Sequence, residues 1–478
     1  MRFRCLSGLL IAVVSLCVGP SAFAAEKWFE DLKRTATPDQ LYSFLYALPK
    51  GGDLHNHLPG AILSEWMWDA ALAQEKRGYV YYTKVKINNC LDYGANEFGP
   101  DRYLLLFKNI QGSRYDELDA CQKSEYKKLQ ELDAREKTAW LNSMRLDAPF
   151  EGRDEFFQAH WPRIGNLIDN PYLIADILYK NMDAFGKEGV VYLETQTDLD
   201  GYFKADGTPF TQNEVAEIFR TFLASKEAKA TGVEVRFQTD LLRFLPNAEE
   251  RLKQVYAITD AYRDLFVGLN MVGREDNDKG YPLRFLSTLR ELRHKYPDIN
   301  LSIHAGEVDE PNLHIKDTLL LGAKRIGHGV NLITDPDTMV MMRNGPYMVE
   351  INLISNLLLE YVSDYSQHPF PEYLRIGVPV ALSTDDRGMW DSNLTDEYFV
   401  AVREFNLSWE EIVLLGRNSL KFSFVDEATK AKLLASYEKR VQAFAQNYQR
   451  KGWAAFQSTK PVSYSFTCKR YKVCLPRE

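Results

Sequence analysis

Seven polar residues in this sequence are of the types that bind metal ions or transfer protons. They are His55, His57, His304, Glu307, His328, Asp385 and Asp386. Each stands in or just after a short apolar run of the kind that forms a buried strand. Where parallel strands close into a barrel, their carboxyl ends meet at one mouth, so side chains far apart in the sequence come together. The pattern therefore predicts one site built from several strands.

The histidines and one aspartate suit a single divalent ion. His55 and His57 alternate along an extended segment, so both imidazoles point to the same side. With His304 and Asp385 they supply three nitrogens and one carboxylate, which are ligands that zinc prefers, and they leave a position for water. No lysine stands at the end of the fourth predicted strand to bridge a second metal. We predict one Zn²⁺ per chain.

The other three residues predict hydrolysis. Bound zinc lowers the pKa of its water from ~15.7 to about 7. Glu307 lies three positions after the ligand His304 and can give or take a proton. His328 and Asp386 are then free to orient the water and hold the substrate. Hydrolysis or hydrolytic deamination is the expected reaction.

Eight strand candidates would position these residues. The first is expected over 53–58 and carries His55 and His57. The other seven are the apolar runs 190–194, 233–237, 267–272, 301–303, 325–327, 348–351 and 380–382. Amphipathic helical segments at 212–228, 248–264, 282–295 and 314–322 separate most of them. Alternating strands and helices indicate parallel βαβ units, and eight of them predict an α/β fold that is a closed (β/α)8 barrel.

Residues 80–150 interrupt this alternation and are expected to form an inserted subdomain over the barrel mouth. Within it we expect a hairpin of 80–82 with 85–87 and a helix over 123–136. Further helices are expected within 26–48, 153–168, 171–187 and 409–453, and an extended tail over 454–478. Residues 25–478 would then form one domain.

Composition and charge favour a small substrate. Of 478 residues, 45% are hydrophobic and 26% charged, which is typical of a folded protein with a large core. The net charge is −8, and losing Arg2 and Arg4 with the leader gives −8 − 2 = −10. An acidic chain without a long basic block is a poor candidate for nucleic-acid binding.

Residues 1–24 have the pattern of a secretory signal peptide. Arg2 and Arg4 precede an apolar run over 9–18 that is too short to span a bilayer, and Ala22-Phe23-Ala24 supplies the cleavage pattern. No second run of spanning length follows. The mature chain is therefore expected to be soluble and exported, to the periplasm or to the medium.

Export to an oxidising compartment would allow the four remaining cysteines to form disulfides. Cys90, Cys121, Cys468 and Cys474 predict two disulfides in an oxidising compartment. Three pairings are open, and locality favours Cys90–Cys121 with Cys468–Cys474.

Between about residues 49 and 423 the chain contains several short motifs in a fixed order. They are Pro49-Lys50-Gly51-Gly52-Asp53-Leu54-His55-Asn56-His57, Val272-Gly273-Arg274-Glu275-Asp276, His304-Ala305-Gly306-Glu307, Arg325-Ile326-Gly327-His328-Gly329, Ile354-Ser355-Asn356, His368-Pro369 and Ser383-Thr384-Asp385-Asp386. Together they resemble the adenosine deaminase family. The leader and the insertion make the chain look most similar to the secreted branch of adenosine deaminase-related growth factors.

The resemblance implies a zinc-dependent enzyme that converts adenosine, and also 2'-deoxyadenosine, to the inosine counterpart and ammonia. It implies the same zinc ligands as the residue types do: His55, His57, His304 and Asp385. The implied partner is a small purine nucleoside.

Roles for four more residues come with the resemblance. Glu307 would protonate ring nitrogen N1 as hydroxide attacks C6, and His328 would steer that hydroxide. Asp386 would hydrogen-bond N7, and the backbone of Gly273 would meet N3.

The sequence also departs from the family pattern. Arg387 stands where the family usually has Pro, Asn352-Leu353 replaces Cys-Pro, and Arg274 stands where the secreted branch tends to have His. These positions leave the substrate open, and another 6-aminopurine is the main alternative. A secreted adenosine-binding or growth-factor-like protein with vestigial catalysis is a second alternative. The N-terminal dimerisation segment of the secreted branch is short here, so both a monomer and a homodimer stay open.

Other histidines and aromatic residues receive structural roles. His160, His294 and His314 are expected at surface or helix-end positions, and His368 is expected to brace the barrel mouth. Trp161 or Trp390 would line a purine pocket.

Overall fold

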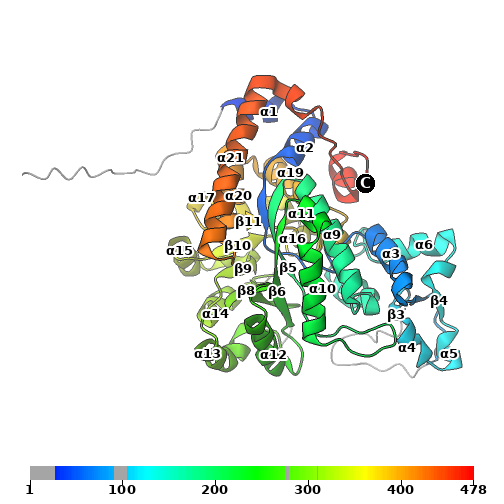
Figure 1. Cartoon of the computed structure of the whole chain (residues 1–478). Coiled ribbons are helices and arrows are strands. Elements are labelled where there is room, and N and C mark those ends of the chain that lie inside the picture. The colour runs from blue at the N-terminus through cyan, green and yellow to red at the C-terminus, as the bar shows by residue number, and fades with distance from the viewer. Residues whose placement is uncertain (1–26, 91–104, 276–278, 309, 478) are drawn as a thin grey trace, which may run out of the picture.

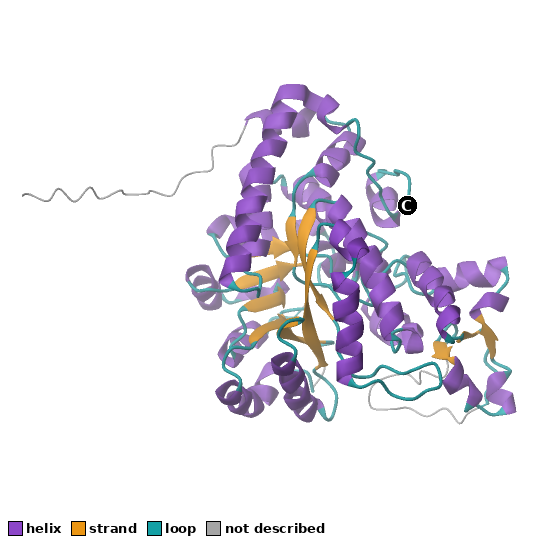
Figure 2. Cartoon of the chain, in the orientation of Figure 1, coloured by secondary structure: helices purple, strands orange, loops and turns teal. Residues whose placement is uncertain are grey.

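A barrel of eight parallel strands forms the centre of the fold (Figures 1 and 2). The computed structural model describes residues 27–90, 105–275, 279–308 and 310–477. The strands are hydrogen-bonded in the order β1-β5-β6-β7-β8-β9-β10-β11. Beyond β1 and β11 the backbones of Asn56 and Asp385 form a parallel bridge, and the amide of Asp385 donates to the carbonyl of His55 at 2.9 Å. This contact closes the ring, and the predicted (β/α)8 barrel is confirmed.

The barrel strands are β1 (Gly51–Asp53), β5 (Val190–Gln196), β6 (Glu234–Leu242), β7 (Phe266–Val272), β8 (Asn300–Ala305), β9 (Arg325–His328), β10 (Met348–Ile351) and β11 (Val380–Leu382). Helices that follow or cover them are α9 (Pro171–Lys187), α10 (Gln212–Ala224), α11 (Lys226–Ala230), α12 (Ala248–Ala261), α13 (Leu286–Lys295), α14 (His314–Leu321), α15 (Pro336–Asn344), α16 (Leu353–Leu358), α17 (Phe370–Ile376), α18 (Arg387–Trp390) and α19 (Leu394–Phe405).

The first strand is shorter and earlier than the sequence predicts. It ends at Asp53 instead of running over 53–58. The Asp53 carboxylate accepts hydrogen bonds from the amide of His55 (3.1 Å) and from Thr384 (2.7 Å), so the chain turns after the strand. His55 and His57 therefore stand on the loop at the barrel mouth, where loops carry function more often than strands do.

The insertion differs from its predicted structure. Strand β2 (Tyr81–Lys84) pairs antiparallel with β3 (Asn109–Gln111) and β4 (Tyr126–Lys128), so the predicted hairpin partner 85–87 is wrong. The predicted helix over 123–136 is also wrong. Helix α5 (Ala120–Lys123) ends before β4, and α6 (Ala134–Asn142) begins only after Asp133, whose side chain caps it. A disulfide joins Cys90 to Cys121.

The two ends of the chain pack together beside the barrel. Helices α1 (Lys27–Thr35) and α2 (Pro38–Ala47) lie against α20 (Trp409–Lys421) and α21 (Glu427–Lys451), the long helix at the top of Figure 1. The tail is not extended throughout as predicted, because α22 (Ser465–Tyr471) forms and a disulfide joins Cys468 to Cys474. None of the helices in the described ranges is both long and apolar enough to cross a membrane.

Between the insertion and α9 the chain forms a broken helix. Helix α3 (Ser64–Ala73) precedes the insertion, and α4 (Gly112–Asp116) lies within it. After the insertion the chain continues as α7 (Arg153–Glu155), a π-helical turn at Phe156–His160 and α8 (Trp161–Ile164). The sequence predicts a single helix over 153–168 instead. Pro162 and Gly165, the latter with φ of +53°, prevent a continuous helix. π-Helical turns of this kind occur frequently at functional sites.

Candidate metal centre and its cavity

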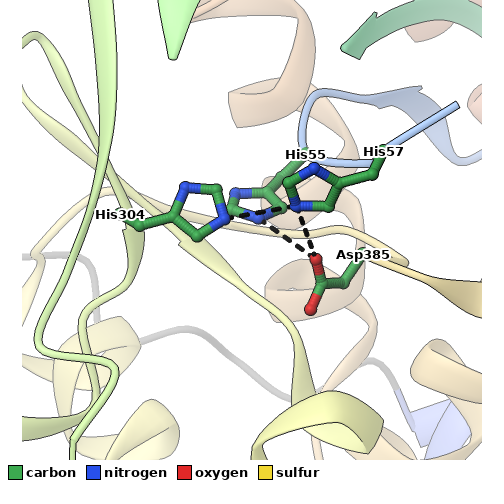
Figure 3. Close-up of side chains that lie close together, drawn as sticks. All are labelled: His55, His57, His304 and Asp385. Carbon is green, nitrogen blue, oxygen red and sulfur yellow. Dashed lines mark hydrogen bonds and ion pairs between the residues drawn. The ribbon is translucent and has the colours of Figure 1, made fainter. Parts of the chain in front are cut away.

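Three imidazoles and one carboxylate meet at the barrel mouth (Figure 3). Oδ1 of Asp385 lies 3.4 Å from Nε2 of His55 and 3.3 Å from Nε2 of His57. Nε2 of His304 lies 3.3 Å from Nε2 of His57. Residues from the first, fifth and eighth barrel strands thus converge as the sequence predicts.

These spacings fit a zinc ion held by four protein ligands, whose coordination can expand to a fifth position for water. Zinc ligands at about 2.0–2.1 Å in a tetrahedron lie roughly 3.3–3.4 Å from one another, which matches the three measured distances. Nε2 of His55 is buried and has no hydrogen-bond partner. A buried ring nitrogen without a partner is costly unless something else binds it. The set is the combination that holds zinc in proteins, so the residues fit the metal.

The outer nitrogens of two ligands are fixed by buried partners. Nδ1 of His55 lies 2.7 Å from Glu350, and Nδ1 of His304 lies 2.9 Å from Oδ1 of Asn270. Such partners set the tautomer and the orientation of a ligand ring. Arg325 in turn lies 2.6 Å from both Glu350 and Glu194, so a buried ion network holds the ring of His55 from inside the barrel.

Electrostatics favour a cation at this point. Burial alone lowers the pKa of His55, but the nearby carboxylates of Asp385 and Glu350 outweigh burial and raise that pKa to about 10. Contacts with His55 and His57 hold the pKa of Asp385 well below its ordinary value despite burial. The carboxylates of Asp385 and Glu350 therefore favour a positive charge at this position, and a divalent ion can supply it in place of a proton.

Two of the site residues have unusual backbones. His328 has a φ of +63° and Asp385 a φ of +53°. Non-glycine residues in this region are strained, and such strain gathers at functional sites because the surrounding structure must impose it. Here it turns both side chains from the ends of β9 and β11 towards the centre of the mouth.

Glu307 and His328 lie beside the ligands. Oε1 of Glu307 is 3.6 Å from Nε2 of His328, which is 4.0 Å from Oδ2 of Asp385. Burial, and then the charges of Asp385 and Glu275, raise the pKa of Glu307 well above its ordinary value. Burial lowers the pKa of His328 to about 4. These shifts favour the protonated form of Glu307 and the neutral form of His328.

Asp386 follows the ligand Asp385 and faces the cavity. Its Oδ1 atom is buried without a hydrogen-bond partner, and burial raises its pKa well above the ordinary value. Gly60 makes room for it, since a Cβ atom there would lie 1.7 Å from this oxygen. A buried carboxyl group without a protein partner is available to a ligand.

A cavity of about 440 Å³ opens from the metal centre. This is within the range of small-molecule pockets. His57, Gly273, His304, Glu307, Asp385 and Asp386 line it. The lining also includes four aromatic residues: Phe156, Phe157 and Trp161, which come from the broken helix after the insertion, and Phe244. Gly273 has a φ of +90°, and a Cβ there would lie 2.7 Å from the ring of Phe244. The aromatic wall suits a flat ring.

The other predicted residues have mixed outcomes. Trp161 lines the cavity, whereas Trp390 is buried outside its lining. His368 lies behind the mouth, where its Nε2 is 2.9 Å from Asn356, a neighbour of His328. His294 is in the last turn of α13 and His314 begins α14. The surface or helix-end prediction for His160 is wrong, because this residue is fully buried in the π-helical turn.

Several supporting residues were not predicted. Glu350 lies within the apolar run of β10, and Asn270 lies within β7. Hydrophobic periodicity therefore predicts only that both are strand residues. Their partners are 295 and 34 residues away. A charged side chain in the middle of a buried run was the one available signal, because such a charge needs a partner.

Comparisons with known proteins agree with this geometry. A family model described as adenosine deaminase matches residues 127–440, which include His304 and Asp385 but not His55 and His57. An adenosine deaminase from Lutzomyia longipalpis is 28% identical over 274 residues, covering 55% of this chain and 53% of that protein. The match thus spans about half the length of that relative. An N6-methyl-AMP deaminase from Bos taurus is 27% identical over 267 residues, covering 54% and 74% of the two chains.

Solved structures share the fold. A zinc-bound amidohydrolase from Burkholderia ambifaria superposes with a TM-score of 0.61 at 17% identity, covering 86% of this chain and 94% of that one. The family match extends over more than half of this chain, and the two histidines that precede it complete the same cluster in space. This chain belongs to the adenosine deaminase family.

Proposed function

We propose that this protein is a zinc-dependent deaminase that converts adenosine and water, and likewise 2'-deoxyadenosine, to the inosine counterpart and ammonia. One observation carries the proposal: Glu307 lines the same cavity as the metal cluster and lies 3.6 Å from His328. A binding protein has no need of a proton-transfer group at that position. The family match supports the same chemistry.

When bound, zinc makes a water molecule available as a nucleophile at neutral pH. The zinc ion would be held by His55, His57, His304 and Asp385. Neighbouring residues would transfer protons and orient the water. Glu307, whose raised pKa favours the protonated carboxyl group, donates to ring nitrogen N1, which makes C6 more electrophilic. His328 offers an unpartnered Nε2 atom that orients the attacking water.

The substrate ring is oriented by two further groups. Asp386, whose raised pKa favours the protonated carboxyl group, would donate from its unpartnered oxygen to N7, and the backbone N–H of Gly273 at the cavity wall would donate to N3. The aromatic wall excludes water from the face of the ring. As the water oxygen bonds to C6 and becomes the carbonyl oxygen, one of its protons passes to the amino group and the other returns to Glu307, and the C6–N bond breaks to release ammonia.

We also propose that the protein acts outside the cytoplasm. The signal-peptide pattern of residues 1–24, which lies outside the described residues, and the two disulfides support this location. In an export-competent host, mass spectrometry of the mature protein should find a chain that begins at Ala25. A full-length chain retained in the cytoplasm would contradict the proposal.

The first test is ultraviolet absorbance of the zinc-loaded protein with adenosine. We expect conversion to inosine that a chelator abolishes and added zinc restores. Glu307→Gln should lose at least about 100-fold in kcat, because general acid catalysis contributes 10²–10⁴-fold, while zinc content and adenosine binding persist. The matched control is Glu291→Gln, an exposed residue on α13.

Each outcome separates the alternatives. Full turnover by Glu307→Gln would remove Glu307 from its role as the acid. No conversion of adenosine by folded, zinc-loaded protein, with conversion of another 6-aminopurine, would replace the substrate. Tight binding of adenosine without turnover of any aminopurine would favour the binding-protein alternative.

A further inference from the structure

Two polar residues on neighbouring strands face the cavity beside the metal centre. Glu194 of β5 points into the barrel, where it pairs with Arg325, so Gln196 two residues later points the same way. On β6, Gln238 donates to Glu194 at 3.1 Å, and Asp240 two residues later shares its face. Both Gln196 and Asp240 line the cavity.

The protein does not satisfy these side chains. Gln196 is only 2% exposed, yet neither its amide nitrogen nor its amide oxygen has a hydrogen-bond partner. Leaving such a group unpaired costs about 1–3 kcal/mol. The half-buried carboxylate of Asp240 accepts no hydrogen bond from another residue in the described ranges and interacts with the charges of His57 and Arg251. Asp198 and Asp200 on the same rim differ, because both pair with Arg251.

The charge of this wall limits the ligand. Asp169, Asp198, Asp200 and Asp240 all line the cavity, and the lining contains no lysine or arginine among the described residues. Arg251 is already held by two carboxylates. A phosphate group needs cationic partners and is repelled by carboxylates. A hydroxyl group both donates and accepts, which matches one amide and one carboxylate.

We propose that Gln196 and Asp240 form a hydroxyl-binding subsite that selects a neutral nucleoside over both a nucleoside 5'-phosphate and a free base. The inference rests on the proposed function, because it names the substrate class for that same site. The subsite lies next to the metal centre, since the backbones of His57 and Gln196 form a parallel bridge. A sugar attached to the base would reach it without leaving the cavity.

The test compares adenosine, adenine and AMP with the zinc-loaded protein. For the wild type we expect kcat/KM for adenosine to exceed that for adenine and for AMP by at least about 100-fold, because a site with buried polar groups rejects ligands that leave them unpaired. Asp240→Ala and Gln196→Leu should each lower the adenosine value by about 10–100-fold and leave the adenine value unchanged. Asp337→Asn, an exposed change on α15, is the matched control.

A second readout does not depend on turnover. Calorimetric binding to the Glu307→Gln protein should give the same order, with adenosine tighter than adenine and AMP, and Asp240→Asn should narrow the gap between adenosine and AMP. If the Asp240 variants lost kcat/KM equally for adenosine and adenine and also lost zinc, Asp240 would act by supporting His57, and the subsite would be overturned. A preference for AMP or adenine would overturn it while the proposed deamination stands. Failure with every aminopurine, in turnover and binding, would retire both.

Discussion

At the scale of single residues, the site depends on groups that never touch the substrate. Glu350 is buried between His55 (2.7 Å) and Arg325 (2.6 Å) and accepts from the hydroxyl of Ser302 at 3.0 Å. These contacts hold its pKa below the ordinary value despite burial. The ionised carboxylate keeps the hydrogen of His55 on Nδ1, so that Nε2 faces the metal position.

We therefore predict that Glu350→Gln weakens zinc binding by about 10–100-fold, the usual effect of losing such a partner. Competition with a chromophoric chelator measures the zinc affinity directly. Glu372→Gln, an exposed change on α17, is the control. Unchanged zinc affinity in a folded Glu350→Gln protein would show that this carboxylate does not support His55.

The protonation states of Glu307 and His328 predict the pH dependence. Glu307 works as an acid, so kcat/KM should fall as pH rises through its raised pKa. His328 works as a neutral ring, so kcat/KM should fall as pH decreases through about 4. A bound cation shifts both limbs to lower pH without reversing either. A pH–rate profile with adenosine tests this, and activity that increases through the alkaline limb would make the ionised Glu307 the working form.

At the scale of elements, prediction succeeded where the signal is local. Apolar runs such as 348–351 and 380–382 match β10 and β11 residue for residue, because buried parallel strands are short and apolar. The sheet of the insertion was missed because β2 pairs with strands that begin 28 and 45 residues further along the chain (109 − 81 and 126 − 81). No local pattern in Tyr126–Lys128 distinguishes an edge strand from a charged helix.

The same reasoning applies to the site. Ligand residues could be predicted because each follows a recognisable strand, whereas Glu350, Gln196 and Asp240 could not. Glu350 matters through its ion pair, Gln196 through its unpaired amide and Asp240 through its place in the cavity lining, and only the closed barrel brings these features together. The broken helix over 153–164 was predicted as regular, since a π-helical turn has no simple sequence signature.

The insertion offers a prediction at this scale. Cys90 and Cys121 are 31 residues apart and Cys468 and Cys474 only 6. In the chain-entropy model a longer closed loop stabilises more, about 3.7 kcal/mol for the first pair and about 2.4 kcal/mol for the second. The Cys90→Ser/Cys121→Ser protein should therefore open its insertion more readily to proteases than the Cys468→Ser/Cys474→Ser protein does. Adenosine turnover at 25 °C should persist in both, and equal protection of the insertion would contradict the ranking.

At the scale of the whole molecule, helix α20 covers the end of the barrel away from the metal centre and connects it to the N-terminal helices. The hydroxyl of Ser419 on α20 accepts from the amide of Gly52 at the start of the barrel (2.7 Å), and Asn418 donates to the carbonyl of Val380 (2.9 Å). An aromatic cluster then joins α20 to the N-terminal helices. Trp28 lies 4.9 Å from Trp409 and 5.5 Å from Tyr448, measured between ring centroids.

This arrangement separates stability from chemistry. Trp28→Ala removes a ring from the cluster, and we expect a loss of about 2–3 kcal/mol, less than the 3–5 kcal/mol of a fully buried aromatic residue because Trp28 is half-buried. Thermal and denaturant unfolding measure the loss, with Phe150→Ala, whose side chain is 82% exposed, as the control. Zinc content and kcat/KM at 25 °C should stay within about twofold of the wild type, because the cluster contacts none of the site residues. A variant that unfolds like the wild type would show that the N-terminal helices do not stabilise the barrel, and one that loses zinc first would show that the two ends of the barrel are coupled.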